Sequence, residues 1–391
     1  MIDKNRIKAN LEKFSVPRLS GSESEKDSFN LLKEKIKKLN LEPQTQNFSF
    51  SSFYSRFYPK ISLAILFAIL YIQIFRIQGV FPRLFLSIIF TLLIIILIFT
   101  RNPERIKIGK IFNSQNVFVK LSCKKSTNDN EEAYSIGKTS LNIFLFSHLD
   151  SKGQRFTIKV RVISVRLWII SILVGFALNA IHTIFFQDSF LFIQIIEIIL
   201  LSTNFIFTLI IVLNTTNNNS NGAIDNASGV SCVLELLNFF LLQENRLDNY
   251  NLWFVFTGAE ETGTMGIRNY FYKYMKELDR SNNYTINFDS ICNKFYLYNH
   301  GLINNLNHKT LNLISDKEEI TELRKSKIFY PGIRSDGLFL LRKKFPGLGI
   351  GDESVYSYVH SIDDTVDKIN ISVLEDLCNL ITVLLNETDN K

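Results

Sequence analysis

Hydrophobic positions along this chain gather in two long apolar blocks, residues 61–99 and 168–213, set in sequence of mixed polarity. Each block is too long for one membrane-spanning helix and about right for two, because a span needs roughly 20 apolar residues. Polar turns at residues 76–79 and 187–189 divide the blocks. The sequence therefore predicts two transmembrane helical hairpins. Their four spans cover residues 61–75 (or from Phe57), 80–99, 168–186 and 190–213.

Buried core helices are an alternative for these blocks, but two adjacent apolar segments that occur twice favour membrane spans. A hairpin returns the chain to the side it left, so all polar segments would share one face of the membrane. Lysines and arginines gather on that face, which the positive-inside bias assigns to the cytoplasm. They are Arg56, Lys60, Arg101, Arg105, Lys107, Lys110, Lys152, Arg155, Lys159, Arg161 and Arg166. We thus predict an integral membrane protein whose polar domain lies on the cytoplasmic side.

The composition is consistent with a membrane protein. Hydrophobic residues make up 46% of the 391 positions, and the mean hydropathy is +0.10. Much of the net charge of +7 flanks the apolar blocks, so membrane lipid is the expected partner and nucleic acid is not. The four cysteines are scattered without a Cys-x-x-Cys pair, which disfavours a zinc finger or a redox motif. Because the chain begins with a polar segment, no secretory signal peptide is expected.

The second apolar block contains three polar residues, Asn179, His182 and Glu197. An ionisable group within a membrane span suggests a functional site by default. The alternative is that His182 and Glu197 lie near the far interface and pair with each other across the hairpin. We favour that pairing.

The polar segments predict an α/β domain. Helices are expected at residues 22–39 and 230–243, which both carry an apolar stripe. Strands are expected at residues 46–50, 116–121, 141–146, 252–256 and 284–288. The last three of these strands are continuous apolar runs, as expected for strands that are buried on both faces of a sheet.

Each of those three buried strands is followed within a few residues by a potential metal ligand or base. His148 follows the first strand, Glu260 the second and Asp289 the third. Side chains placed just beyond the carboxyl ends of strands meet at one edge of an α/β sheet, where such proteins bind their ligands. The sequence therefore predicts a site at this edge.

Five side chains along the chain are of types that bind metal ions: His148, Asp225, Glu261, Asp289 and His360. Two of the chain's five histidines are among them. Imidazole and carboxylate groups are suitable zinc ligands, and a catalytic site keeps one coordination position open. Two divalent ions close together can lower the pKa of a shared water and stabilise a tetrahedral intermediate.

Two further carboxylates suggest supporting roles. Asp150, two residues after His148, can orient the imidazole ring. Glu260 and Glu261 are adjacent, so their side chains diverge, and one can bind metal while the other faces the water as a general base. Taken alone, the first motif could be a strand-end turn, and the Glu-Glu pair could be exposed helix surface.

Six motifs in this order resemble the co-catalytic di-zinc aminopeptidase family, which includes leucyl aminopeptidases, glutamate carboxypeptidase II and glutaminyl cyclases. The resemblance covers nearly all of the polar chain. The motifs are Pro17-Arg18-Leu19-Ser20-Gly21-Ser22, His148-Leu149-Asp150-Ser151, Asp225-Asn226-Ala227-Ser228-Gly229-Val230, Thr257-Gly258-Ala259-Glu260-Glu261-Thr262-Gly263, Ser335-Asp336 and His360-Ser361-Ile362-Asp363-Asp364-Thr365.

The resemblance implies a mixed central sheet flanked by helices, here interrupted by the two hairpins, and two zinc ions. It also implies a role for each ligand. Asp225 would bridge the two ions, and the Asp225–Asn226 peptide would be cis. His148 and Asp289 would complete one zinc site, and Glu261 and His360 the other. Glu260 would be the general base, and Asp150 would orient His148.

By the same resemblance, we expect a membrane-embedded aminopeptidase that hydrolyses the N-terminal bond of a peptide substrate. The catalytic domain would comprise residues 1–56, 101–166 and 214–391, with hairpins at residues 57–100 and 167–213. A glutaminyl-peptide cyclase, which uses one zinc, is the first alternative. A non-catalytic receptor or scaffold on a peptidase-like fold is the second, and it is less favoured because such relatives tend to lose ligands.

Overall fold

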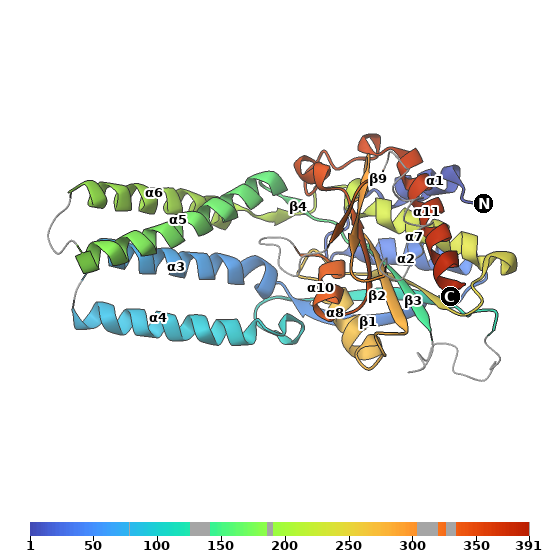
Figure 1. Ribbon diagram of the computed structural model, residues 1–391, viewed down its shortest axis with the longest axis horizontal. Coiled ribbons are helices and arrows are strands. Elements are labelled where there is room, and N and C mark those ends of the chain that lie inside the picture. The colour runs from blue at the N-terminus through green and yellow to red at the C-terminus, as the bar shows by residue number, and fades with distance from the viewer. Residues whose placement is uncertain (78, 126–140, 186–190, 303–319, 326–333, 391) are drawn as a thin grey trace. The chain divides into compact units, whose positions relative to one another are not determined.

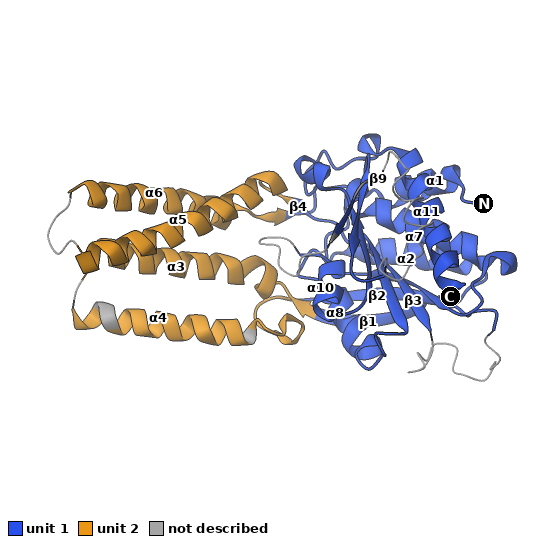
Figure 2. Cartoon of the chain, viewed as in Figure 1, with its two compact units in different colours: residues 1–49, 112–153, 217–391 blue, residues 50–111, 154–216 orange. Residues whose placement is uncertain are grey.

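The chain folds into two compact units, which are coloured separately in Figure 2. The computed structural model describes residues 1–77, 79–125, 141–185, 191–302, 320–325 and 334–390. Unit 1 consists of Met1–Ser49, Phe112–Gly153 and Asn217–Lys391, and unit 2 of Phe50–Ile111 and Gln154–Thr216. The apolar blocks thus lie in unit 2, and all five potential metal ligands lie in unit 1.

Unit 1 is built on an eight-stranded sheet with the strand order β1-β2-β6-β3-β7-β10-β8-β9. Its centre is parallel, since β3 pairs in parallel with β6 and β7, and β7 with β10. Antiparallel pairs of β2 with β6 and of β8 with β10 flank this centre. The expected mixed sheet is confirmed. The strands are β1 Gln44–Ser51, β2 Ile111–Leu121, β3 Asn142–His148, β6 Asn251–Thr257, β7 Asn283–Phe288, β8 Phe295–Asn299, β9 Ile320–Lys325 and β10 Gly347–Gly351.

The three central strands β3, β6 and β7 are buried along their whole length, as their continuous apolar sequence predicted. Their aromatic side chains form much of the core on one face of the sheet. Phe144 and Trp253 stack with ring centroids 5.8 Å apart, and Phe146 meets Tyr270 edge to face at 5.8 Å. This packing fixes the strands whose ends carry the candidate ligands.

Helices cover both faces of the sheet (Figure 1). Helices α1, α7 and α11 pack against one another on one side, and the short helices α8 and α10 lie on the other. The predicted helix at residues 22–39 is α2, whose first turn is capped by Ser22, which accepts a hydrogen bond from the nitrogen of Glu25. The helix predicted at residues 230–243 is α7. The bounds are α1 Lys4–Phe14, α2 Glu23–Lys37, α7 Ser228–Leu241, α8 Met265–Tyr270, α10 Asp336–Arg342 and α11 Ile371–Asp389.

Unit 2 contains four long helices, one for each predicted span: α3 Tyr58–Ile74, α4 Val80–Phe99, α5 Ile158–Phe185 and α6 Leu191–Leu213. Helix α5 begins at Ile158 rather than at residue 168, because the basic segment before the apolar block continues the same helix. Helices α3, α5 and α6 share a small apolar core that includes Leu70, Trp168 and Leu201. The predicted turn at residues 187–189 lies outside the described residues.

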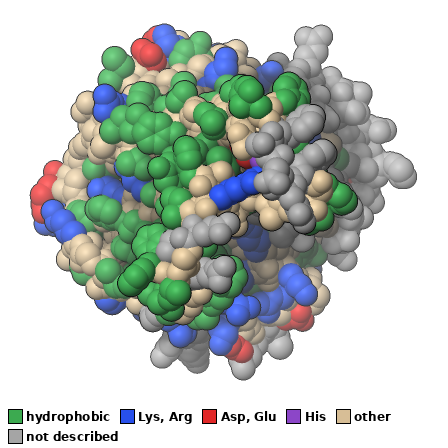
Figure 3. Space-filling model, turned by 90° about the vertical axis from the view of Figure 1, so that its left-hand side faces the viewer, with side chains coloured by type: hydrophobic (Ala, Val, Ile, Leu, Met, Phe, Trp, Pro, Cys, Tyr) green, Lys and Arg blue, Asp and Glu red, His purple; other side chains and the backbone are tan. Residues whose placement is uncertain are grey.

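Most of the remaining apolar side chains of these helices are exposed. They include Phe90, Leu173, Ile184 and Phe192, and Figure 3 shows a surface rich in hydrophobic side chains. A contiguous apolar surface of this kind on a helical bundle is unfavourable in water and favourable in lipid.

By length and composition, four helices could cross a membrane: Phe53–Ile74, Ile158–Phe185, Leu191–Leu213 and Ala223–Leu241. They are not the four that were predicted. The apolar window of Ala223–Leu241 is 83% buried within unit 1, so this segment, which contains α7, is a core helix. Helix α4 contributes the shorter apolar stretch Leu84–Ile98. A hydropathy criterion alone therefore does not separate a buried core helix from a span.

The polar residues inside the second hairpin pair with each other, as we expected. The Nδ1 atom of His182 lies 3.2 Å from Oε2 of Glu197, and both side chains are buried. The amide of Asn179 donates to the carbonyl oxygen of Gln73 at 3.2 Å, which connects α5 to α3. These contacts hold the helices of unit 2 together.

Candidate metal centre

The candidate ligands converge at one edge of the sheet because the strands that precede them are parallel neighbours. Strand β3 ends at His148, and Asp289 follows the last residue of β7. Strand β6 ends at Thr257, and the turn after it carries Glu260 and Glu261. This confirms the expectation that three strand ends meet at one edge.

The other two ligands come from segments outside the sheet. Asp225 lies in the irregular turn Ala223–Ala227 before α7, and its peptide bond to Asn226 is cis, as predicted. His360 lies beyond the short helix Glu353–Ser357 and has a positive φ of 63°.

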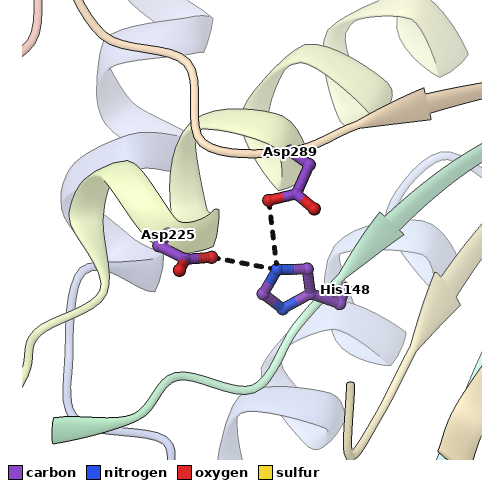
Figure 4. A group of neighbouring side chains, drawn as sticks. All are labelled: His148, Asp225 and Asp289. Atoms are coloured by element: carbon purple, nitrogen blue, oxygen red, sulfur yellow. Dashed lines mark ion pairs between the residues drawn. The ribbon is translucent and has the colours of Figure 1, made fainter. Parts of the chain in front are cut away.

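Asp225 lies at the centre of the site, since its two carboxylate oxygens face different imidazoles. Its Oδ1 lies 3.0 Å from Nε2 of His148, which is also 3.7 Å from Oδ1 of Asp289 (Figure 4). Its Oδ2 lies 3.1 Å from Nε2 of His360, which is 2.6 Å from Oε1 of Glu261. The ligands thus form two donor groups that share Asp225: one with His148 and Asp289, and one with Glu261 and His360.

The donor atoms within each group lie within 4.8 Å of one another, and each group could hold a metal ion. One imidazole and two carboxylates are a donor set suited to zinc. Oε1 of Glu261 is buried, and Nε2 of His360 lies 2.6 Å from it. Because imidazole nitrogens and carboxylate oxygens converge in both groups, the residues fit the metal ions that the motifs imply.

Electrostatics in the site follow from burial and from the crowding of carboxylates. Burial alone would raise the pKa of Asp225, but its contacts with His148 and His360 outweigh this and hold the pKa well below its usual range. Burial raises the pKa of Glu260 well above its usual range, and the neighbouring carboxylate of Glu261 adds to this shift. The contact of Glu261 with His360 and Lys152 likewise outweighs burial and lowers its pKa to about 2, so Asp225 and Glu261 have lowered pKa values and Glu260 a raised one.

Asp150 contacts His148 mainly through its backbone. Nδ1 of His148 lies 3.0 Å from the carbonyl oxygen of Asp150 and 3.6 Å from its carboxylate. The carboxylate accepts hydrogen bonds from Ser20 Oγ at 2.5 Å and from the backbone nitrogens of Glu260 and Glu261 at 3.0 and 3.1 Å. Asp150 thus fixes both the histidine and the turn that carries the two glutamates, and only the first of these roles was expected.

Arg18 is a supporting residue whose role was not predicted from the sequence. Its buried guanidinium donates to the carbonyl oxygens of Leu149 at 2.6 Å, Asn221 at 2.9 Å and Gly222 at 3.0 Å, and it also contacts those of Phe14 and Val16. It thereby connects the segments that carry His148 and Asp225. Arg18 belongs to the family motif at residues 17–22, but an arginine that donates to backbone carbonyl oxygens leaves no charge-pair pattern in a sequence.

Two other buried polar residues position the turn at Asp225. Oδ1 of Asp364 accepts a hydrogen bond from the backbone nitrogen of Ile224 at 2.6 Å. The side chain of Asn226 donates to the carbonyl oxygen of Phe288 at 2.8 Å, one residue before Asp289. The turn at Asp225 is therefore held against both the segment of His360 and the end of β7.

Comparison with known proteins finds a matching peptidase family and similar folds. Residues 208–385 match the model of Peptidase family M28. No curated protein sequence matches the chain. Among solved structures, the aminopeptidase from Aneurinibacillus sp. strain AM-1 is similar at 13% identity and a TM-score of 0.53, with 98% of this chain and 93% of that chain covered.

Two further similar structures differ in their named activity. The zinc aminopeptidase from Bacillus subtilis shares 12% identity at a TM-score of 0.54, over 99% of this chain and 96% of its own. The glutaminyl cyclase from Bacteroides thetaiotaomicron shares 14% identity at a TM-score of 0.52, over 100% of this chain and 99% of its own. At these identities the structures show a common fold. Together with the family match, they confirm that this chain resembles the co-catalytic zinc peptidases of family M28.

Proposed function

We propose that this protein is a membrane-embedded, zinc-dependent aminopeptidase that hydrolyses the N-terminal bond of peptides. The observation that carries the proposal is the pair of donor groups sharing Asp225, with the buried Glu260 next to the ligand Glu261. The family match and the zinc aminopeptidase of similar fold support a zinc exopeptidase.

We assign His148, Asp225 and Asp289 to one zinc ion, and Asp225, Glu261 and His360 to the other. Bound zinc would act as a Lewis acid toward the peptide carbonyl and lower the pKa of a water. Glu260 is the proposed general base: it takes a proton from the attacking water and returns it to the leaving amine. Asp150 fixes the backbone nitrogen of Glu260, so the base keeps one position relative to the ligands.

The helices of unit 2 are the proposed membrane anchor. Exposed apolar side chains on α3, α4, α5 and α6 favour a lipid environment, because water would leave them unfavourably hydrated. The lysines and arginines that flank the spans support a cytoplasmic position of the catalytic segments, residues 1–56, 101–166 and 214–391.

A glutaminyl cyclase is a second candidate, because cyclases from several bacteria are among the proteins of similar fold. That reaction forms a ring from an N-terminal glutamine and releases ammonia, so it needs no attacking water. A receptor without catalysis is disfavoured because all five potential ligands and the base are present and converge.

A panel of aminoacyl-coumarin amides, assayed on the detergent-purified full-length chain, tests the proposal. We expect amide hydrolysis that a chelator abolishes and added zinc restores. Peptides with N-terminal glutamine are run in parallel. Cyclisation of these peptides without hydrolysis of any amide would favour the cyclase, and a zinc-loaded chain active on neither set would favour a receptor.

A further inference from the structure

The two donor groups are matched in chemical type. Each combines one imidazole, one carboxylate of its own and one oxygen of the shared Asp225. Two divalent ions would therefore meet the same formal charge in both groups. A charge close to one group and absent from the other would make the affinities of the two groups differ.

Lys152 supplies such a difference. Its Nζ lies 2.6 Å from Oε2 of Glu261, and the two side chains are only 13% and 5% exposed. None of the ion pairs among the described residues joins a lysine or an arginine to Asp225 or Asp289. The ammonium group of Lys152 thus pairs with one carboxylate oxygen of Glu261. Among the described residues, the group of His148, Asp225 and Asp289 has no such pair.

The backbone on both sides of Lys152 is fixed. Ser151 exchanges hydrogen bonds with Arg18, through its own backbone nitrogen and through its Oγ, both at 2.9 Å. On the other side, a Cβ atom at Gly153 would lie 2.0 Å from Oδ1 of Asn217, so the chain is packed tightly there. Because its neighbours cannot shift freely, Lys152 is held within reach of Glu261.

We propose that Lys152 is a positioning residue that makes the two metal sites unequal. It holds Oε2 of Glu261 and leaves Oε1, the oxygen that faces His360, for the metal. Its positive charge also repels a dication at the group formed by Asp225, Glu261 and His360. The group of His148, Asp225 and Asp289 therefore fills first, and the second ion binds more weakly. This inference rests on one part of the proposed function, namely that both donor groups bind zinc.

Metal stoichiometry on the full-length, detergent-purified chain tests the inference without any assay of activity. The demetallated chain is equilibrated at a series of buffered free zinc concentrations, and bound zinc per chain is measured. We expect two separate steps for the wild type, and loss of the tighter step in the His148→Ala variant. Lys152→Met removes the charge at similar length and should tighten the second step about 10- to 100-fold.

Lys152→Arg is the matched control, since it keeps the charge and should keep two separate steps. Lys152→Gln replaces the methionine variant if that chain does not fold. A second step that is no tighter in the uncharged variants than in the wild type would overturn the inference. A wild-type chain that binds no zinc at all would instead overturn the proposed function.

Discussion

Asp150 accepts a hydrogen bond from the backbone nitrogen of Glu260 at 3.0 Å, across a separation of 110 residues in the chain. The contact joins the segment just after β3, whose last residue is His148, to the turn after β6, which carries Glu261. Because the second carboxylate oxygen accepts from the nitrogen of Glu261, one side chain fixes the turn that carries both glutamates. The site therefore depends on backbone positioning as much as on its ligands.

Replacing Asp150 with asparagine should weaken this arrangement. The amide has only one oxygen, so one of the buried N–H groups of Glu260 and Glu261 loses its acceptor. We expect a loss of about 1–3 kcal/mol of stability and of roughly 10- to 100-fold in activity. Ser20→Ala, which removes a donor to the same carboxylate, is the control. Thermal unfolding and steady-state kinetics measure both effects, and equal losses in the two variants would contradict the assignment.

Glu260→Gln should separate chemistry from metal binding. Glutamine keeps the size of the side chain but cannot take a proton, so kcat should fall by roughly 10²- to 10⁴-fold. Metal content should stay at the wild-type level, because Glu260 belongs to neither donor group. Glu261→Gln is the comparison, and it should lose bound metal as well as activity. A fully active Glu260→Gln enzyme would refute the role of Glu260 as general base.

The sequence predicted the ligands and the contact of Asp150 with His148, but not the other supporting contacts of the site, for physical reasons. Apolar runs before His148 and Asp289 marked buried strands, so the convergence of their ends followed from sheet geometry. His360 follows no such strand, and only its resemblance to a family motif identified it. Strand β10 was not predicted either, because its sequence Gly-Leu-Gly-Ile-Gly has few residues of high strand propensity.

Arg18 shows why supporting residues are hard to find in a sequence. Its bonding partners are backbone carbonyls as far as 203 and 204 residues away, and a carbonyl can belong to any residue type. Only the folded structure shows that one guanidinium donates hydrogen bonds both to the segment after His148 and to the segment before Asp225.

Arg18→Lys should therefore destabilise unit 1 although it conserves the charge. Burial lowers the pKa of Arg18 to about 10, so the guanidinium is charged near neutral pH. A lysine ammonium has three donors and no planar fork, and several buried carbonyls would lose their partner. We expect a loss of about 3 kcal/mol or more, together with lower metal retention. Lys26→Arg, at an exposed position of α2, is the control, and an unchanged melting temperature for Arg18→Lys would contradict the role of Arg18.

His300 should make the protein less stable in acid. Burial lowers its pKa to about 4, below the ordinary value, so the folded state favours the neutral imidazole. The unfolded chain takes up its proton first as the pH falls, and stability is lost between the ordinary pKa of about 6.5 and the folded value. Between pH 7 and pH 5 the loss is about 2 kcal/mol. The melting temperature of His300→Gln should depend less on pH over this range than that of the wild type. An identical pH dependence of the two melting temperatures would exclude a contribution of His300.

Two glycines in β10 allow a matched test of the sheet that leads to Asp289. A Cβ at Gly347 would lie 1.8 Å from the carbonyl oxygen of Thr285 in the neighbouring strand β7, so Gly347→Ala must push the strands apart. At Gly349 the nearest atoms would be 3.5 Å away, which is an ordinary contact. We expect Gly347→Ala to cost about 2–3 kcal/mol and to reduce zinc retention, since β7 positions Asp289. Gly349→Ala should stay within about 0.5 kcal/mol of the wild type. Equal melting temperatures for the two variants would show that the spacing of β7 and β10 does not limit the site.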